Sequence, residues 1–92
     1  MMTLSVTAKF KKDYKRMKKQ GKDLSRLQAV IDTLLAGVPL DARHRDHALT
    51  GNDTGFRECH IQPDWILIYA IDNNRLILTA SRTGSHSDLF DE

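Results

Sequence analysis

The chain of 92 residues has the length of one small domain, and its 40% apolar and 28% charged side chains exclude a disordered protein. Its single cysteine excludes an internal disulfide and is typical of a reducing compartment, so we expect a cytoplasmic protein. No apolar run approaches the roughly 18 residues of a membrane span, and we therefore expect no membrane partner.

The net charge of +2 hides two parts of opposite sign. Residues 1–26 hold nine basic and two acidic side chains, a net of +7, whereas the remainder holds five arginines and ten acids, a net of −5. Such a basic surface, which includes Lys15 and Lys19, favours a polyanionic partner. Lysine-rich helix faces are also often merely solvated.

The first half of the chain predicts a short strand over residues 3–7 and then two helices. Between residues 8 and 20, Phe10, Tyr14 and Met17 recur at spacings of four and three, which predicts a helix with a narrow buried stripe. Asp23 is a suitable N-cap for a second helix. The wide apolar face of that helix consists of Leu24, Leu27, Val30, Ile31, Leu34 and Leu35. The short connection between the two predicts a helical hairpin.

Residues 39–54 show neither the helical nor the strand spacing of apolar residues, which predicts a long polar loop. Loops of this length are often functional. Residues 56–62, 65–71 and 75–82 then read as strands joined by short turns. Ser85 and Asp88 have the spacing of a capping box, so we expect a short terminal helix. The fold class is therefore α+β: an N-terminal strand, a helical hairpin, a three-stranded antiparallel sheet and a short C-terminal helix, with the helices on one sheet face.

The two short turns allow the strand register to be estimated. A turn centred on Pro63 and Asp64 pairs Gln62 with Trp65 and His60 with Leu67; a turn centred on residues 73 and 74 pairs Trp65 with Arg82. One face would then carry His60, Gln62, Trp65 and Arg82. The face toward the helices would carry Cys59, Ile61, Ile66, Ile68, Ala70 and Ile77. A turn of three residues would invert this assignment.

Three histidines from separate segments would converge near Arg82 and Asp64: His47 from the loop, His60 from the sheet and His86 from the tail. This set suits RNA cleavage by attack of a ribose 2′-hydroxyl on the neighbouring phosphate. One group removes the hydroxyl proton, another protonates the departing 5′-oxygen, and a guanidinium stabilises the charge that develops on the phosphate. Each of these residues, taken alone, also suits a purely structural role.

Further residues suit RNA contacts rather than chemistry. Phe90 or Trp65 could stack on an unpaired base, although a core position is favoured for Trp65 and Phe90 could simply dock the tail onto the sheet. Arg43 and Arg45, in the polar loop, suit phosphate groups.

We expect neither a metal nor a cofactor. The spacing of His44 and His47 relative to the other histidines matches no usual zinc pattern. Cys59 and His60 are neighbours on a strand and would point to opposite faces.

Three segments resemble the YafQ-type branch of the RelE/ParE superfamily, which comprises toxins of bacterial type II toxin–antitoxin modules. They are RDHALTG (45–51), GFRECHIQPDWILIY (55–69) and RTGSHSDLF (82–90). The most specific part is HxxPDW followed by a strand and RTGSH, and the likeness covers most of the chain.

The resemblance implies a ribosome-dependent, metal-independent endoribonuclease that cleaves messenger RNA during translation and is neutralised by a cognate antitoxin. By motif position it implies roles in acid–base transfer, phosphate stabilisation and base stacking for His47, His60, Asp64, Arg82, His86 and Phe90. The sequence departs from the family at Ala48, where we would expect proline, and in the acidic stretch of residues 52–54.

Two alternatives stay open at this point. One is a ParE-like toxin that inhibits gyrase by binding alone, against which the histidine set argues. The other is a non-catalytic nucleic-acid-binding module, in which the histidines are incidental.

Overall fold

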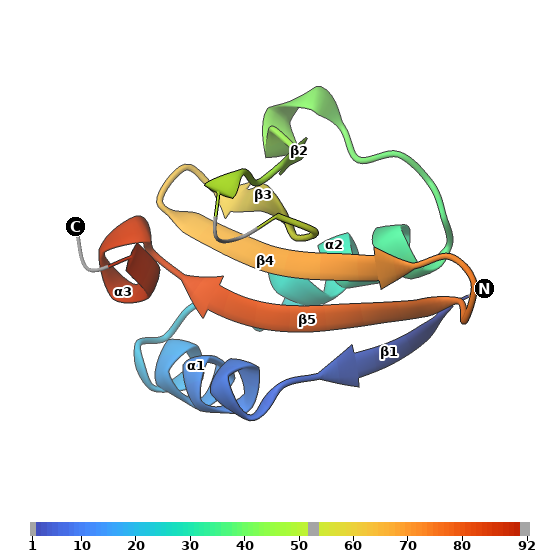
Figure 1. Ribbon diagram of the computed structural model, residues 1–92. Helices are drawn as coiled ribbons and strands as arrows, with labels where there is room; N and C mark the ends of the chain where they lie inside the picture. Colours follow the sequence, from blue (N-terminus) through green and yellow to red (C-terminus); the bar gives the residue numbers. More distant parts are fainter. Residues whose placement is uncertain (1, 52–53, 91–92) are drawn as a thin grey trace.

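A mixed five-stranded sheet in the order β1-β5-β4-β3-β2 forms the centre of the computed structural model, which describes residues 2–51 and 54–90 (Figure 1). The strands are β1 (Thr3–Val6), β2 (His47–Ala48), β3 (Arg57–Gln62), β4 (Trp65–Asp72) and β5 (Ile77–Gly84). The helices are α1 (Ala8–Lys19), α2 (Leu24–Leu35) and α3 (His86–Phe90), with a 3-10 turn, η1 (Ala42–His44). β1 pairs with β5 in parallel, and the remaining strand pairs are antiparallel. The predicted α+β class and its order of elements are confirmed.

Local signals place the two long helices where the sequence predicts them. The hydroxyl of Thr7 accepts the backbone N–H of Phe10 at the start of α1, and Asp23 caps α2. The expected stripe of α1 is wrong at one position, because Tyr14 is 39% exposed whereas the neighbouring Asp13 is only 2% exposed.

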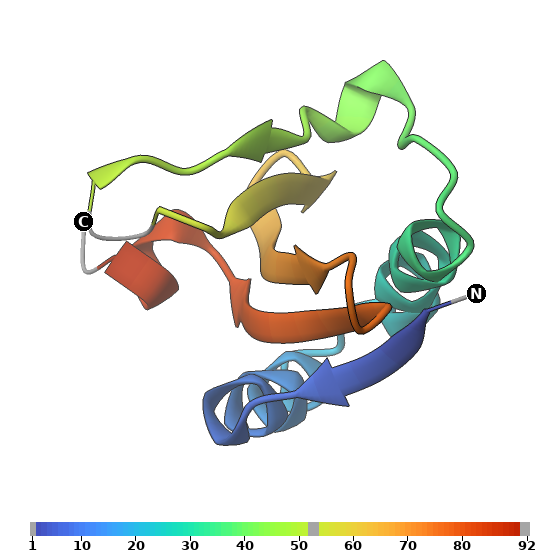
Figure 2. The same cartoon turned by 45° about the vertical axis from the view of Figure 1, so that its right-hand side comes forward.

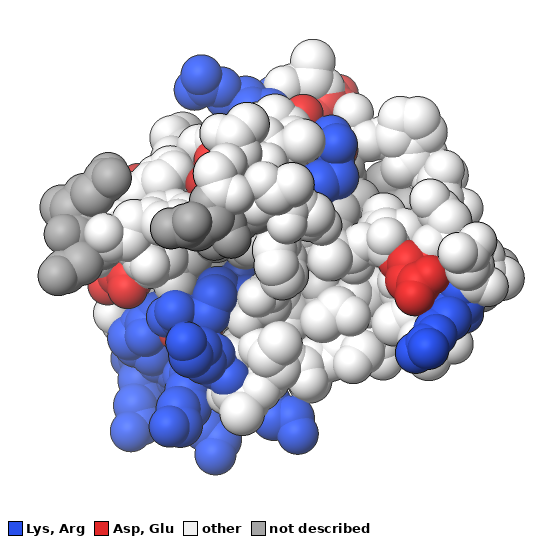
Figure 3. Space-filling model, in the orientation of Figure 1, with Lys and Arg blue, Asp and Glu red and all other residues white. Residues whose placement is uncertain are grey.

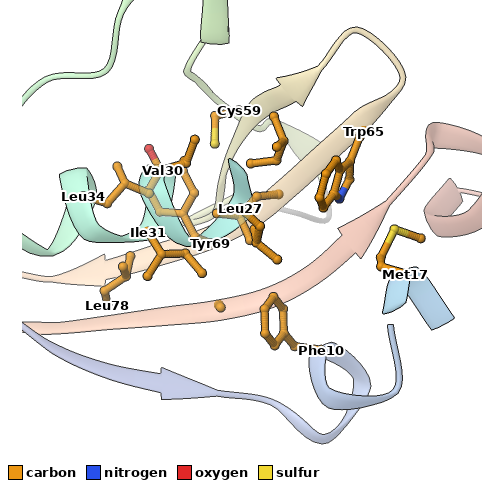
Figure 4. Packing of buried hydrophobic residues seen from close by; sticks show 13 residues of the cluster. Phe10, Met17, Leu27, Val30, Ile31, Leu34, Cys59, Trp65, Tyr69 and Leu78 are labelled. Atoms are coloured by element: carbon orange, nitrogen blue, oxygen red, sulfur yellow. The ribbon is translucent and has the colours of Figure 1, made fainter. Parts of the chain in front are cut away.

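The core lies between the helices and one face of the sheet (Figure 4). Leu27, Val30, Ile31 and Leu34 of α2 are all buried, as the wide apolar face predicts. The opposing side chains from the sheet are Cys59, Ile61, Trp65, Leu67, Tyr69, Leu78 and Ala80.

Irregularities in two strand pairs overturn the predicted register. Gln62 pairs with Trp65 as expected, but a shift in β3 then pairs His60 with Ile66 instead of Leu67. The β4–β5 turn is centred one residue later than predicted, because Asp72 pairs with Ile77. A second shift in β5 then pairs Ile68 with Arg82, so Arg82 does not face Trp65. Extra residues in a strand reverse the faces of the side chains beyond them.

The faces of β4 are therefore the reverse of the prediction. Trp65 and Leu67 point into the helix-packed core, and Ile66 and Ile68 pack outside that cluster. The indole N–H of Trp65 donates to the Thr83 hydroxyl at 2.9 Å, which satisfies its polar atom inside the core. His60 and Arg82 still share one face, as predicted, but without Trp65.

The segment 39–54 is more regular than expected. It contains η1 and the short strand β2, which adds to the edge of β3. The predicted acidic stretch at residues 52–54 falls largely outside the described residues. Within the described part of the chain, every helix is too short or too polar to cross a membrane.

Candidate active site

Glu58 stands at the centre of a cluster of imidazoles on the outer face of the sheet, the face away from the helix-packed core. β2 places His47 directly opposite Glu58, and His60 follows Glu58 by two positions on the same face of β3. His86 comes from the first turn of α3. Strand pairing and the tail thus bring together three segments that are distant in the sequence.

The Nε2 atoms of all three histidines approach the Glu58 carboxylate. His86 lies 3.2 Å from Oε1, and His47 and His60 lie 3.3 and 3.9 Å from Oε2. The carboxylate is almost fully buried, with a side-chain exposure of 7%, whereas His47 and His86 are 51% and 40% exposed. Two imidazoles therefore reach solvent above a buried acidic group.

The hydrogen bonds at the far side of two rings define where protons lie. Nδ1 of His47 is 2.7 Å from the carbonyl of Arg45, and Nδ1 of His60 is 3.2 Å from that of Pro63. A carbonyl oxygen can only accept a hydrogen bond, so each Nδ1 carries a proton. The other ring nitrogen, Nε2, faces Glu58 in both histidines. Each contact is attractive only when a proton lies between nitrogen and carboxylate. This arrangement can therefore hold protons between the imidazoles and the carboxylate.

α3 carries His86 and is anchored at its start. The Ser85 hydroxyl accepts the backbone N–H of Asp88, and the Asp88 carboxylate accepts that of Ser85, which confirms the capping box. The backbone N–H of Ser85 holds the pKa of Asp88 below its usual value. Phe90 stacks on the His86 ring, with centroids 5.9 Å apart and planes at 26°.

A second anchor joins α1 to the end of β5. Nη2 of Arg16 lies 3.8 Å from the Asp88 carboxylate and donates to the Thr83 carbonyl at 3.4 Å. A β-carbon at Gly84 would lie 2.9 Å from that same Nη2, and the φ of 151° at this position favours glycine.

Arg82 is held by Asp13. Its Nε and Nη2 donate to the two carboxylate oxygens at 2.6 and 3.1 Å, which raises the pKa of the guanidinium. Arg82 lies in the same row of the sheet as Ile68 and Glu58, two strands from Glu58 and hence about 10 Å away. Arg82 therefore lies beside the imidazole cluster on the same face of the sheet, without belonging to the set of side chains that contact Glu58.

The remaining predicted residues lie around this centre. Asp64 is an exposed residue of the β3–β4 turn and lines a cavity of about 230 Å³ with Ser85 and Asp88. Arg43 lies in η1 and Arg45 directly follows it, both exposed. Lys15 and Lys19 are exposed on α1, over which basic side chains gather in Figure 3.

The cluster also has the donors of a metal site. One ligand atom each from Glu58, His60 and His86 lie within 4.8 Å of one another. Imidazole nitrogens with a carboxylate oxygen suit Zn²⁺ or Cu²⁺. The sequence analysis did not predict this set, because it considered the histidines and Cys59 as ligands and not Glu58.

Sequence reasoning missed two residues of this region. Glu58 shares the alternation of His60, so ECH (58–60) on a strand was an available signal. Asp13 gave no signal, because it lies among lysines on a helix that reads as solvated.

The fold and this cluster define a class: a small α+β protein with an imidazole–carboxylate cluster between the outer face of its sheet and a C-terminal helix. Residues 2–91 match the model of the family described as the bacterial toxin of type II toxin–antitoxin system, YafQ. The chain therefore belongs to the YafQ toxin family.

Several known proteins resemble the chain over nearly its whole length. The mRNA interferase toxin YafQ of Escherichia coli K12 is 36% identical over 88 residues, covering 95% of this chain and 94% of the relative. A copper-bound mutant toxin from Helicobacter pylori superposes with a TM-score of 0.92 at 43% identity, covering 98% and 100%. The DinJ–YafQ complex of E. coli contains a chain with a TM-score of 0.89 at 35% identity, covering 98% and 99%.

Proposed function

We propose that this protein is the toxin of a type II toxin–antitoxin module and an endoribonuclease that cleaves messenger RNA. The observation that supports this most strongly is the buried Glu58 carboxylate beneath the three imidazoles of His47, His60 and His86. The E. coli relative is named an mRNA interferase. Inhibition by binding alone, as in a gyrase inhibitor, would need no such proton-transfer cluster.

The reaction is a transesterification. A base removes the proton of a ribose 2′-hydroxyl, and the oxygen attacks the adjacent phosphorus. The bond from phosphorus to the 5′-oxygen breaks, and an acid protonates that oxygen. The products are a 2′,3′-cyclic phosphate and a 5′-hydroxyl. The proposed step exchanges one P–O bond for another and moves two protons, so it needs no oxidant or reductant, and we propose that it proceeds without a metal.

The roles follow from exposure. His47 and His86 reach solvent and act on the substrate, whereas His60 and Glu58 lie beneath and orient them. Nε and Nη2 of Arg82 are engaged by Asp13, which leaves Nη1 for the phosphate. Phe90, stacked on His86, offers a surface for a base. Asp64 contributes at the rim of the site.

The proposed partners follow from charge and from the relatives. The lysine face of α1 contacts ribosomal RNA while the toxin acts on translated messages in the cytoplasm. A cognate antitoxin neutralises the toxin, as DinJ is found with YafQ in a complex.

The decisive experiment maps cleavage of a message on programmed ribosomes with the purified toxin. We expect cuts that leave a 2′,3′-cyclic phosphate, that disappear when the nucleotide before the cut carries a 2′-deoxy substitution, and that persist in EDTA. An intact message together with failure of supercoiling would overturn the proposal in favour of a gyrase inhibitor. RNA binding without any cut would favour a non-catalytic module.

A further inference from the structure

A cavity of about 620 Å³ lies between α2, η1 and β3. The chain leaves α2, arches to η1 and returns along β2, as Figure 2 shows, and the cavity lies under this arch. Its apolar lining comes from Ala29 and Val30 of α2, Leu40 and Ile61. A volume of this size is in the range of small-ligand sites, which is about 300–1,000 Å³.

The arch is attached to the strand through His44. β2 covers only the start of β3, so the later part of β3 has an open edge. Nδ1 of His44 donates to the carbonyl of His60 at 2.7 Å, on that edge. Arg45 then takes a left-handed backbone with φ of 49°, which turns the chain toward β2. The hydrogen bond of His44 and the backbone turn at Arg45 thus fix the wall of the cavity.

Three arginines surround the cavity and give it a basic rim: Arg26, Arg43 and Arg45. Within residues 2–51 and 54–90, neither Arg43 nor Arg45 has a carboxylate at ion-pair distance. The one acid of the lining, Asp41, accepts the backbone N–H of Arg43 as the cap of η1. The free guanidinium groups therefore face solvent beside an apolar floor.

We infer that this cavity binds one nucleotide of single-stranded RNA, next in the strand to the nucleotide that is cleaved. This rests on the proposed function. His60 lines the cavity at the edge of β3, and its ring belongs to the Glu58 cluster on the outer face, so a strand that passes around this edge reaches both. The base packs on the apolar floor, and its phosphate pairs with Arg43 and Arg45. A flanking nucleotide held here would fix the position of the reacting phosphate.

Binding is tested with a non-cleavable probe, so that it is independent of catalysis. A fluorescent six-nucleotide RNA, fully 2′-O-methylated, is titrated with the intact toxin while backbone amide shifts are recorded by NMR. We expect shifts at Ala29, Thr33 and His44 of the lining. The logarithm of the binding constant should fall with that of salt concentration by about 0.7 per phosphate contact.

Two variants separate the floor from the rim. Ala29→Phe fills the cavity from an exposed helix position and should weaken RNA binding about tenfold or more. Its control, Gln28→Phe, adds the same side chain to an exposed position of α2 outside the lining and should bind normally.

The double variant Arg43→Ala with Arg45→Ala tests the rim. It should weaken RNA binding and reduce the salt slope by about 1.4, at 0.7 per contact. The control Arg75→Ala, in the β4–β5 turn, should change neither the RNA binding constant nor the salt slope.

The outcomes distinguish the two proposals. Loss of probe binding in Ala29→Phe, with the Gln28→Phe control intact, supports the inference whether or not the toxin cleaves. Cleavage with normal probe binding in Ala29→Phe overturns the inference and leaves the proposed function standing. If Ala29→Phe binds RNA normally but escapes neutralisation by the antitoxin, the cavity serves an acidic protein segment and the inference is wrong.

Discussion

Glu58 shows how one buried residue organises three exposed ones. Strand pairing and α3 bring His47, His60 and His86 into one small region, and the Glu58 carboxylate is their common contact there. A buried carboxylate without such partners would be costly, because water no longer solvates its charge. The same contacts that offset this cost hold the imidazoles in position for proton transfer.

Replacing Glu58 tests this organising role. Glu58→Gln keeps the shape but removes the negative charge and replaces one acceptor oxygen with an NH2 donor, so the side chain no longer exchanges protons with the imidazoles. We expect single-turnover cleavage on programmed ribosomes to fall about 10²–10⁴-fold, the usual size of an acid–base contribution. Asp32→Asn removes an exposed carboxylate from α2 and should cleave at the normal rate. Full activity of Glu58→Gln would contradict the role.

Cys59 is buried beside this site but on the other face of β3, with no exposed surface. Burial raises the pKa of its thiol from 9.0 to about 12. In the native protein at pH 8 we expect no reaction with an aromatic disulfide reagent, and reaction once the protein is unfolded. Rapid labelling of the folded protein would be the opposite result.

The raised pKa also predicts a pH dependence of stability. Below pH 9 the thiol is protonated in both the folded and the unfolded state, and its contribution to the free energy of unfolding is complete. As pH rises from 9 toward 12, only the unfolded state releases the thiol proton, so the folded state loses stability relative to it. The free energy of unfolding of the wild type, relative to Cys59→Ala, should therefore fall by up to about 1.4 kcal/mol per pH unit above 9. Urea titrations of both proteins at pH 8 and 10 measure this difference.

At the scale of elements, α1 completes the sheet where β1 ends. β1 pairs with β5 only as far as Ala80, which leaves the next part of β5 with an open edge. Asp13 accepts the backbone N–H of Thr83 at 3.2 Å, and Arg16 donates to the Thr83 carbonyl. A helix thus satisfies strand groups that another strand would otherwise pair.

Removing Asp13 should therefore cost more than a typical surface change. Asp13→Ala leaves Arg82 and the Thr83 N–H without their acceptor in a buried place. We expect the free energy of unfolding, from denaturant titration, to fall by about 3 kcal/mol or more. Asp32→Ala, on the exposed side of α2, should change it by less than about 0.5 kcal/mol. Equal stability of the two variants would disprove the structural role of Asp13.

At the scale of the whole molecule, the basic side chains and the histidines lie in different parts of the chain. Basic side chains gather over α1, at the lower left of Figure 3, whereas the four histidines lie in the segment of net charge −5. Under the proposed function, long-range attraction to a polyanion and the reaction itself belong to different parts of the surface.

This separation predicts a binding defect without a catalytic one. Lys15→Glu with Lys19→Glu should weaken ribosome binding at low salt and reduce its salt dependence, because two exposed cations are reversed. At saturating toxin, the cleavage rate should be unchanged. Arg75→Glu reverses one charge in the β4–β5 turn and should have little effect. A lower rate at saturation would place these lysines in the catalytic step instead.

The helices and caps could be predicted because their signals are local. The spacing of Leu27, Val30, Ile31 and Leu34 and the cap at Asp23 act within a few residues of one another. The faces of β4 could not, because register depends on irregularities in β3 and β5 that alternation does not reveal.

The sequence by itself determined the elements, the division of charge, the family resemblance and the histidines as candidates. Only the tertiary structure decided that Trp65 lies in the core, that Glu58 joins the three imidazoles, and that Asp13 holds Arg82. The physical reason is that these contacts join residues on different strands and helices. Core packing and edge pairing determine which faces meet, and neither is encoded in the spacing of neighbouring residues.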